Sequence, residues 1–508
     1  MRSRASLARS AASAARPAPS PSISGCDTAP RSSPSGRAPG EGALTQARAP
    51  VQLLHRRLGH SPAFRIGGDR RMLKRRILAA FSGPCVPIGA VGLPMIVYLP
   101  PYYASTLGLD LAAVGLVFFL VRAIDLPLDP LLGHWMDRTR SRYGRYRPWL
   151  LAGGLTLAAG VWLVFMAEPG LSPFSAFAFL MVLYLGYSLT AVAQLGWGST
   201  LTDDYHQRSR LFSWWMAAQV LGMILVLLLP PLAGGGPAGG IHAMGWFIIV
   251  TAPVTVAVMI LAVPERERAG ERPHAGWREI KALAKNPLLL RLIVLDILTS
   301  AAPGITGAMF LFYFEHRLGF AAREASLLLL IYFVAGFGAA PLWIALARRI
   351  GKHRALAAAA LAYAVFQLGL SLLPPSLGMA GAIPAMAIVG LPYIAAPSLL
   401  RAMLNDAADV DRLETGLDRN ALLQALLTST QKISYAVPVA IIYPILSLIG
   451  FNPRPGDYNS EGAILGMTLL FVLAPVALML AAAWVASRWP LDRMRHAQVQ
   501  EKLAARGP

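Results

Sequence analysis

From residue 77 onward, the chain alternates long apolar blocks with short polar segments. A helix of about 20 apolar residues spans the hydrocarbon core of a bilayer, and each block is long enough to do so. The blocks occupy residues 77–99, 112–135, 148–167, 173–199, 212–232, 243–262, 288–313, 325–347, 354–373, 379–403, 421–449 and 462–487. The pattern predicts an all-α polytopic membrane protein with twelve transmembrane helices.

Basic residues alternate between the segments that connect these blocks. The connections after the second, fourth, sixth, eighth and tenth blocks contain RTRSRYGRYR, DDYHQRSR, ERERAGERPHAGWREIKALAK, RRIGKHR and DRLETGLDR. The connections after the first, third, fifth and ninth blocks contain no lysine or arginine. Because basic loops remain on the cytoplasmic side, we expect a multi-pass protein of the plasma (inner) membrane with both termini in the cytoplasm.

The two halves of the chain share a pattern at a constant offset of 211 residues. The matched positions are Leu107-Gly108 with Leu318-Gly319, Pro130 with Pro341, and Arg138 with Arg349. Parallel repeats of this kind build the major facilitator fold, in which two six-helix bundles surround a central site. The expected parts are an N-terminal bundle at 72–262, a cytoplasmic linker at 263–287, a C-terminal bundle at 288–490 and a basic cytoplasmic tail at 491–508.

Amino-acid composition sets the N-terminal segment apart from the rest of the chain. The chain is 55% hydrophobic and 14% charged, with a net charge of +20. Residues 1–71 are rich in Ala, Ser, Pro and Arg, and such a segment is expected to be disordered. Either it is an organellar transit peptide or translation begins at Met72, and the basic lead MLKRRILAAFSG favours Met72. Because the remaining basic charge follows the loops, nucleic acid is not an expected partner.

Three charged residues interrupt the second apolar block in FFLVRAIDLPLDPLLGHW. Arg122, Asp125 and Asp129 are three and four residues apart, so they share one face of the predicted helix. At the 211-residue offset, a glycine and an alanine replace the two acids, so the duplicated scaffold does not need them. Charge inside a membrane is costly, and we interpret the acids as functional. Asp296, early in the seventh block, is interpreted as a capped or solvated acid.

Depth in the membrane connects the two acids with Thr190 and Lys432. All four lie roughly 20–26 Å below the outer boundary at 1.5 Å per helical residue. Carboxylates with a hydroxyl suit a hard cation, and Lys432 supplies a competing positive charge. Two simpler interpretations stay open: Arg122 only neutralises Asp125, or the Lys432 side chain extends to the cytoplasmic face.

The segments RAIDLPLDP, TRSRYGRYRPW, LTDD and QKIS resemble those of the glycoside–pentoside–hexuronide:cation symporters, the melibiose-permease branch of the major facilitator superfamily. The resemblance covers most of residues 77–500, and it implies symport of a sugar with Na⁺, Li⁺ or H⁺. The implied cation-site residues are the carboxylates Asp125 and Asp129 and the hydroxyl of Thr190, with Arg122 and Lys432 as neighbouring charges.

Further positions match a loop motif and a candidate gate. Gly133, Asp137 and Arg138 resemble the general facilitator motif G-x-x-x-D-R. The run MLNDAADVDRLETGLDR follows the tenth block, so its acids are predicted to close the inner mouth by pairing with arginines of the first half. The candidate gate residues are Arg208, Arg210, Asp406 and Asp409.

The sugar side of the resemblance is weaker than the cation side. Melibiose-type permeases place acids on helices I and IV and an arginine on helix V, where this chain has Gly89, Ala193 and Met216. Sugar hydroxyls favour charged, bidentate partners, so a simple galactoside is not favoured. The remaining polar or stacking candidates for substrate binding are Gln194, Trp197, Gln219 and Tyr393.

The leading hypothesis is a secondary active transporter that couples Na⁺ or H⁺ to the symport of a glycoside or related small solute. The alternatives are transport of a larger, lysolipid-like amphiphile on the same scaffold, or a membrane sensor that does not transport. An enzyme is disfavoured because the sequence has no HExxH, GxSxG or Walker pattern. We expect a monomer in the lipid bilayer that needs no cofactor besides its coupling ion.

Overall fold

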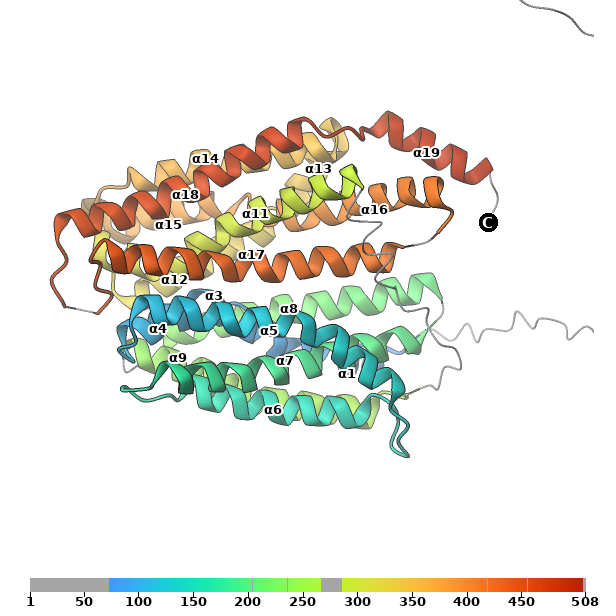
Figure 1. The fold of residues 1–508 in the computed structure, drawn as a ribbon, viewed down its shortest axis with the longest axis horizontal. Coiled ribbons are helices and arrows are strands. Elements are labelled where there is room, and N and C mark those ends of the chain that lie inside the picture. The colour runs from blue at the N-terminus through green and yellow to red at the C-terminus, as the bar shows by residue number, and fades with distance from the viewer. Residues whose placement is uncertain are drawn as a thin grey trace, which may run out of the picture. The chain divides into compact units, whose positions relative to one another are not determined.

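The computed structural model describes residues 73–202, 204–234, 236–265, 286–417, 419–454 and 456–505. Within these ranges every regular element is a helix, and Figure 1 shows the long helices running side by side. Twelve helical stretches of this described part are long and apolar enough to cross a membrane. The prediction of an all-α protein with twelve transmembrane helices is confirmed. The predicted tail at 1–71 and most of the predicted linker at 263–287 lie outside the described residues.

The first half of the described chain forms the first six membrane-length stretches. Its helices are α1 (Arg75–Ser82), α2 (Cys85–Gly92), α3 (Pro94–Val97), α4 (Leu99–Ser105), α5 (Leu111–Arg138), α6 (Arg147–Phe165), α7 (Pro173–Leu201), α8 (Tyr205–Leu232) and α9 (Gly236–Ala262). The block predicted at 77–99 is interrupted after Ser82 and after Gly92, next to Pro84 and Pro94. Proline lacks the backbone N–H that continues a helix, which explains why one apolar block contains several short helices.

The second half repeats this plan with its own interruptions. Its elements are α11 (Pro287–Phe312), the π-helical turn η1 (Tyr313–Arg317), α12 (Ala322–Gly338), α13 (Ala340–Ile350), α14 (Lys352–Ser371), the 3₁₀ turn η2 (Pro375–Leu377), α15 (Gly378–Gly390), α16 (Ala395–Thr415), α17 (Asn420–Leu448), α18 (Glu461–Ser487) and α19 (Arg493–Ala505). Pro341 and Pro392 lie at the breaks that divide the predicted eighth and tenth blocks. The basic tail predicted at 491–508 contains the helix α19 in its described part.

Side-chain caps fix where several of these helices begin. In each case the side chain of the capping residue accepts a hydrogen bond from a backbone N–H in the first turn, which would otherwise lack a partner. The capping residues are Asp110 of α5, Ser172 of α7, Asp204 of α8, Asn286 of α11 and Ser460 of α18.

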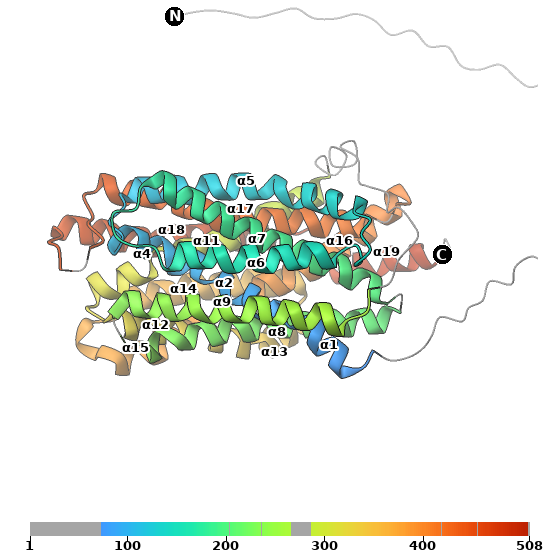
Figure 2. The same cartoon turned by 90° about the horizontal axis from the view of Figure 1, so that it is seen from below.

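The two halves pack against each other mainly through α5 with α17, α8 with α12, and α3 and α4 with α11. Figures 1 and 2 show α1 and α19 at one end of the bundle, which we call the basal end; the opposite end is the distal end. Helices of the two halves approach each other closely toward the distal end. A Cβ on Gly115 of α5 would lie 3.0 Å from the Val439 carbonyl oxygen of α17, and one on Gly307 of α11 would lie 3.2 Å from Val97. The distal ends of the two halves are therefore tightly joined.

Candidate functional site

The two acids of the second apolar block lie in the middle of α5. Asp125 is fully buried, and its Oδ2 atom lies 3.3 Å from Nη1 of Arg122, one turn earlier on the same helix. The Arg122 guanidinium also lies over the ring of Tyr184, 4.8 Å from its centroid. The predicted pair of Arg122 and Asp125 is therefore present, but it is only part of a larger cluster.

Lys432 of α17 reaches across from the other half of the molecule. Its ammonium group lies 3.1 Å from Oδ2 of Asp125 and also donates a hydrogen bond to Asp129. The Lys432 side chain therefore turns into the protein instead of extending to the cytoplasmic face, and the simpler interpretation of this lysine is wrong for this structure. Arg122, Asp125, Asp129 and Lys432, which we call the charge cluster, join α5 to α17.

The hydroxyl next to the acids belongs to Ser188. Its Oγ atom donates a hydrogen bond of 2.8 Å to Oδ1 of Asp125, and both residues are buried. Thr190 does not contact the cluster in this structure. Its hydroxyl donates to the Gly186 carbonyl oxygen, and it faces Gly153 of α6, where a Cβ would lie 2.7 Å from Thr190 Oγ1. Ser188, which the sequence reasoning missed, takes the position that was expected for Thr190.

The charges of the cluster balance, with two carboxylates facing one guanidinium and one ammonium. One acceptor is left over: Oδ1 of Asp129 is buried and has no hydrogen-bond partner among the described residues. The described part of the chain contains no group of three or more His, Cys, Asp or Glu side chains arranged to hold a metal ion. Two carboxylates with one hydroxyl place together oxygen atoms of the kind that bind a hard cation.

A cavity of about 390 Å³ lies between the two halves beside this cluster. Its walls come from α2, α5, α7 and α8 of the first half and from α11, α12, α14 and α18 of the second, among others. Most lining side chains are aliphatic or aromatic, and Arg122 is the only charged one that the described residues contribute. The cavity has the dimensions of a small-molecule site.

Two of the four predicted substrate residues line this cavity, namely Gln219 and Tyr393. Gln194 and Trp197 do not, and both are fully buried inside the first half. The Gln194 amide donates to the Phe81 carbonyl oxygen at 2.7 Å, and the Trp197 indole donates to the Pro264 carbonyl oxygen at 3.3 Å. The prediction for these two residues is corrected: their polar atoms tie α7 to its neighbours and are not offered to a ligand here.

The acids of the predicted gate pair within the second half. Asp406 lies 2.7 Å from the Lys352 ammonium, and Asp409 lies 2.9 Å from Nε2 of His496 in α19. On the first half, Arg208 donates to the Thr202 carbonyl oxygen at 3.4 Å. Arg210 donates to the Gln207 side chain at 3.0 Å. Among the described residues, Arg208 forms no pair with the acids of α16, and Lys352 and His496 are partners that the sequence reasoning missed.

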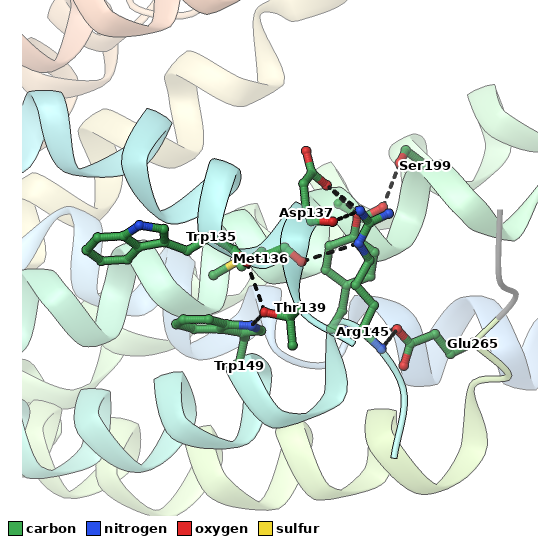
Figure 3. Close-up of polar contacts among 10 residues, drawn as sticks. Trp135, Met136, Asp137, Thr139, Arg145, Trp149, Ser199 and Glu265 are labelled. Carbon is green, nitrogen blue, oxygen red and sulfur yellow. Dashed lines mark hydrogen bonds and ion pairs between the residues drawn. The ribbon is translucent and has the colours of Figure 1, made fainter. Parts of the chain in front are cut away.

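Arg145, in the loop between α5 and α6, makes polar contacts with the end of α5 and with Glu265 (Figure 3). The Arg145 guanidinium lies 3.7 Å from Oδ1 of Asp137 and donates to the carbonyl oxygens of Met136 and Asp137. The Arg145 backbone N–H donates to Glu265, just after α9, at 2.6 Å. The guanidinium partner of the motif acid Asp137 is thus Arg145, which follows the motif by several residues. Gly133 has ordinary space around it, since a Cβ there would lie 3.8 Å from Val192.

Two further buried polar groups have unsatisfied atoms. Both carboxylate oxygens of Asp296 and the Oε1 atom of Gln367 are buried without a hydrogen-bond partner among the described residues. Asn286, and not Asp296, caps α11, so the interpretation of Asp296 as a capped or solvated acid is corrected. Gln367 lines the cavity, and its spare acceptor is one that sequence alone did not single out.

Comparisons with known proteins agree with this architecture. A family model described as "MFS/sugar transport protein" matches residues 80–493. The inner membrane symporter YicJ of Escherichia coli (strain K12) is 28% identical over 238 residues, which cover 44% of this chain and 51% of that protein. A lactose permease of Lactobacillus delbrueckii subsp. bulgaricus is 23% identical over 412 residues, 75% of this chain and 64% of the permease. The alignments thus span about half to two thirds of these relatives.

A solved structure shares the fold. The crystal structure of a point mutant of the nucleoside transporter NupG superposes with a TM-score of 0.61 and 14% identity, covering 81% of this chain and 99% of that one. At this identity the likeness concerns the fold alone. The predicted arrangement of twelve helices in two six-helix bundles is confirmed.

Proposed function

Because the chain belongs to the MFS/sugar transport protein family, we propose that it is a secondary active transporter. It couples the symport of a glycoside or related small solute to a cation, Na⁺ or H⁺, by alternating access. The observation that carries this proposal is the charge cluster, in which a lysine of one half pairs with two acids of the other beside a central cavity. The printed names of its relatives, a symporter and a lactose permease, support a coupled solute carrier.

The cluster provides a way to link cation binding to movement. The Lys432 ammonium lies between Asp125 and Asp129, where a coupling cation would find its oxygen ligands. Binding of that cation removes the reason for Lys432 to stay, because the carboxylates then have another positive charge. The ionic contact between α5 and α17 is thereby released, and the two halves are free to rearrange around the cavity.

The packing supports an inward-facing conformation. The halves are tightly joined toward the distal end, where Gly115 meets Val439 and Gly307 meets Val97. The basal end carries the basic loops and α19, so the positive-inside rule places it in the cytoplasm. The cavity is therefore closed toward the outside, with both described chain ends cytoplasmic. The protein functions as a monomer in the plasma (inner) membrane.

One observation favours the second candidate, transport of a larger amphiphile. The cavity walls are mostly apolar, and the described lining residues include no carboxylate to hold sugar hydroxyls. This candidate uses the same cation site and the same alternating access, so the two differ only in the chemistry of the solute.

The decisive experiment measures Na⁺ binding and Na⁺-stimulated uptake together. Isothermal calorimetry on the purified protein and uptake of radiolabelled lactose or lysophosphatidylcholine into proteoliposomes are compared for the wild type, Asp125→Asn and Asp129→Asn. We expect both variants to fold, to lose Na⁺ binding by about 100-fold or more, and to lose the Na⁺ stimulation of uptake. Acidification should weaken Na⁺ binding to the wild type, because protons compete for the same carboxylates.

Glu461→Gln is the matched control, because it removes an exposed acid in the first turn of α18, far from the cluster. It should bind Na⁺ as the wild type does. Na⁺ and pH dependence that persists in both aspartate variants would show that these acids serve the structure only. Intact Na⁺ binding without uptake or counterflow of any solute would favour a sensor.

A further inference from the structure

We propose that the transported solute is an amphiphilic organic anion, with one acidic group that binds Arg122 and an apolar body that packs on the second half of the cavity. This inference rests on the proposed function and specifies the substrate class of the same site. Its basis is the charge of the cavity and of the cluster behind it, together with an aromatic wall opposite Arg122.

The described residues present one charged side chain to the cavity, and its charge is positive. Arg122 is the only charged side chain among the described lining residues, and no carboxylate accompanies it there. Of the five N–H donors on its guanidinium, one of the two on Nη1 hydrogen-bonds to Asp125, and the others have no hydrogen-bond partner in the described part of the chain. A guanidinium with free donors at the edge of an apolar cavity is suited to a carboxylate or a phosphate monoester.

The coupling cation makes this site more attractive to an anion. Without the cation, two acids balance Arg122 and Lys432, so the cluster has no net charge. A bound cation adds one positive charge while it takes over the Oδ2 atom of Asp125 that Arg122 and Lys432 had shared. Arg122 is then free to turn its donors to the solute, whose negative charge restores neutrality. A neutral sugar would leave this excess charge buried, which is costly.

The opposite wall provides the apolar contact surface. Tyr393 lies against three other rings that line the cavity, with centroid separations of 5.6 Å to Tyr332, 5.0 Å to Phe333 and 6.2 Å to Phe337. We call these four residues the aromatic wall. Gln367 adds one buried acceptor, its Oε1 atom, for a hydroxyl or amide donor on the solute. Because Arg122 belongs to the first half and the aromatic wall to the second, a solute with both parts contacts both halves.

Two matched pairs of probes test the charge requirement. 4-Nitrophenyl β-D-glucuronide and 4-nitrophenyl β-D-glucoside share a ring and a sugar, and 4-phenylbutyrate and 4-phenylbutyramide share a ring without a sugar. Binding to the purified protein is measured by calorimetry with and without Na⁺. We expect at least one acid to bind about 10-fold or more tightly than its neutral counterpart, and only in Na⁺.

The second test is the variant Arg122→Gln, with Arg291→Gln as control. Arg291 is an exposed arginine of α11 that donates to the Arg488 carbonyl oxygen, so its loss removes one charge away from the cavity. We expect Arg122→Gln to abolish the preference for the acid while it keeps a cooperative thermal transition, which shows that the variant is folded, and Arg291→Gln to leave the preference unchanged. In proteoliposomes, symport of the acid with one Na⁺ should carry no net current.

The outcomes separate this inference from the proposed function. Equal binding of acids and neutral counterparts, no binding of either acid, or an equal effect of Arg122→Gln on both members of a pair would overturn the inference. Na⁺-stimulated uptake of a neutral solute with a net inward current would also overturn it, while the proposed cation-coupled symport would stand. Failure to bind Na⁺, together with the absence of uptake driven by a proton gradient, would overturn the proposed function.

Discussion

Replacing Lys432 with methionine removes the ammonium group that links the two halves and nearly preserves the length of the side chain. In the proposed mechanism, Na⁺ displaces this ammonium, which lies 3.1 Å from Asp125 and also binds Asp129. Two unit charges about 4 Å apart interact by about 4 kcal/mol at an effective dielectric constant of about 20. Partial compensation by Arg122 and by water leaves about 2–3 kcal/mol. Lys432→Met should therefore bind Na⁺ about 30- to 150-fold more tightly than the wild type.

The same substitution should uncouple binding from transport. Without Lys432, cation binding no longer breaks a contact between α5 and α17, so uptake in proteoliposomes should lose its Na⁺ stimulation although calorimetry shows tighter binding. The cluster is left with an uncompensated carboxylate, so the variant should melt at a lower temperature than the wild type without Na⁺ and recover when Na⁺ is added. Lys352→Met is the control, because it breaks the 2.7 Å pair with Asp406 at the basal end. Unchanged or weaker Na⁺ affinity in Lys432→Met would refute the reasoning.

Three further predictions follow from other contacts. Ser188→Ala should weaken Na⁺ binding about 10-fold in calorimetry because the site loses a buried hydroxyl on Asp125, whereas Thr190→Val should stay within about threefold. Equal effects of the two changes would contradict this assignment. Arg208→Glu should impair uptake if the outward-facing state pairs this residue with the acids of α16, and added Asp406→Lys should partly restore it; strictly additive losses would exclude the gate. Gly89→Ala should lower the melting temperature in detergent, equivalent to about 1–3 kcal/mol, because its Cβ would lie 2.1 Å from a carbonyl oxygen of α8.

The fold could be predicted from the sequence because, in a membrane, the length of an apolar block is nearly enough to identify a helix. A lipid-exposed backbone must satisfy its own hydrogen bonds, so an apolar block of sufficient length becomes a helix. The boundaries were less accurate where the apolar signal ends before the helix does. The tenth block was predicted to end at 403, yet α16 continues to Thr415. Its last turns are amphipathic: Leu404 and Ala407 are buried while Asn405 is exposed.

The sequence predicted how deep the site residues lie in the membrane, but not in which direction around the helix axis their side chains point. Counting residues placed Asp125 and Lys432 at one level, and the structure brings them into contact. The same count could not distinguish Ser188 from Thr190. Helix positions that are two residues apart differ by only about 3 Å in height, but their side chains point in directions about 200° apart. Gln194 and Trp197 were misplaced for the same reason. Partners such as His496 depend on the docking of α19, which a count along one helix does not describe.

The pairing of α5 with α17 also has a mechanical consequence. Gly115 lets the two backbones approach near the distal end, and the charge cluster joins them farther along. In the proposed mechanism a cation releases the contact at the charge cluster while the close approach at Gly115 remains, so the two halves tilt about the distal contact. From Asp125 to the basal end of α5 at Arg138 is about 20 Å at 1.5 Å per residue. The cluster lies about 15 Å from Gly115 and Arg138 about 35 Å from it, so a separation of about 1 Å at the cluster becomes about 2 Å at the basal mouth.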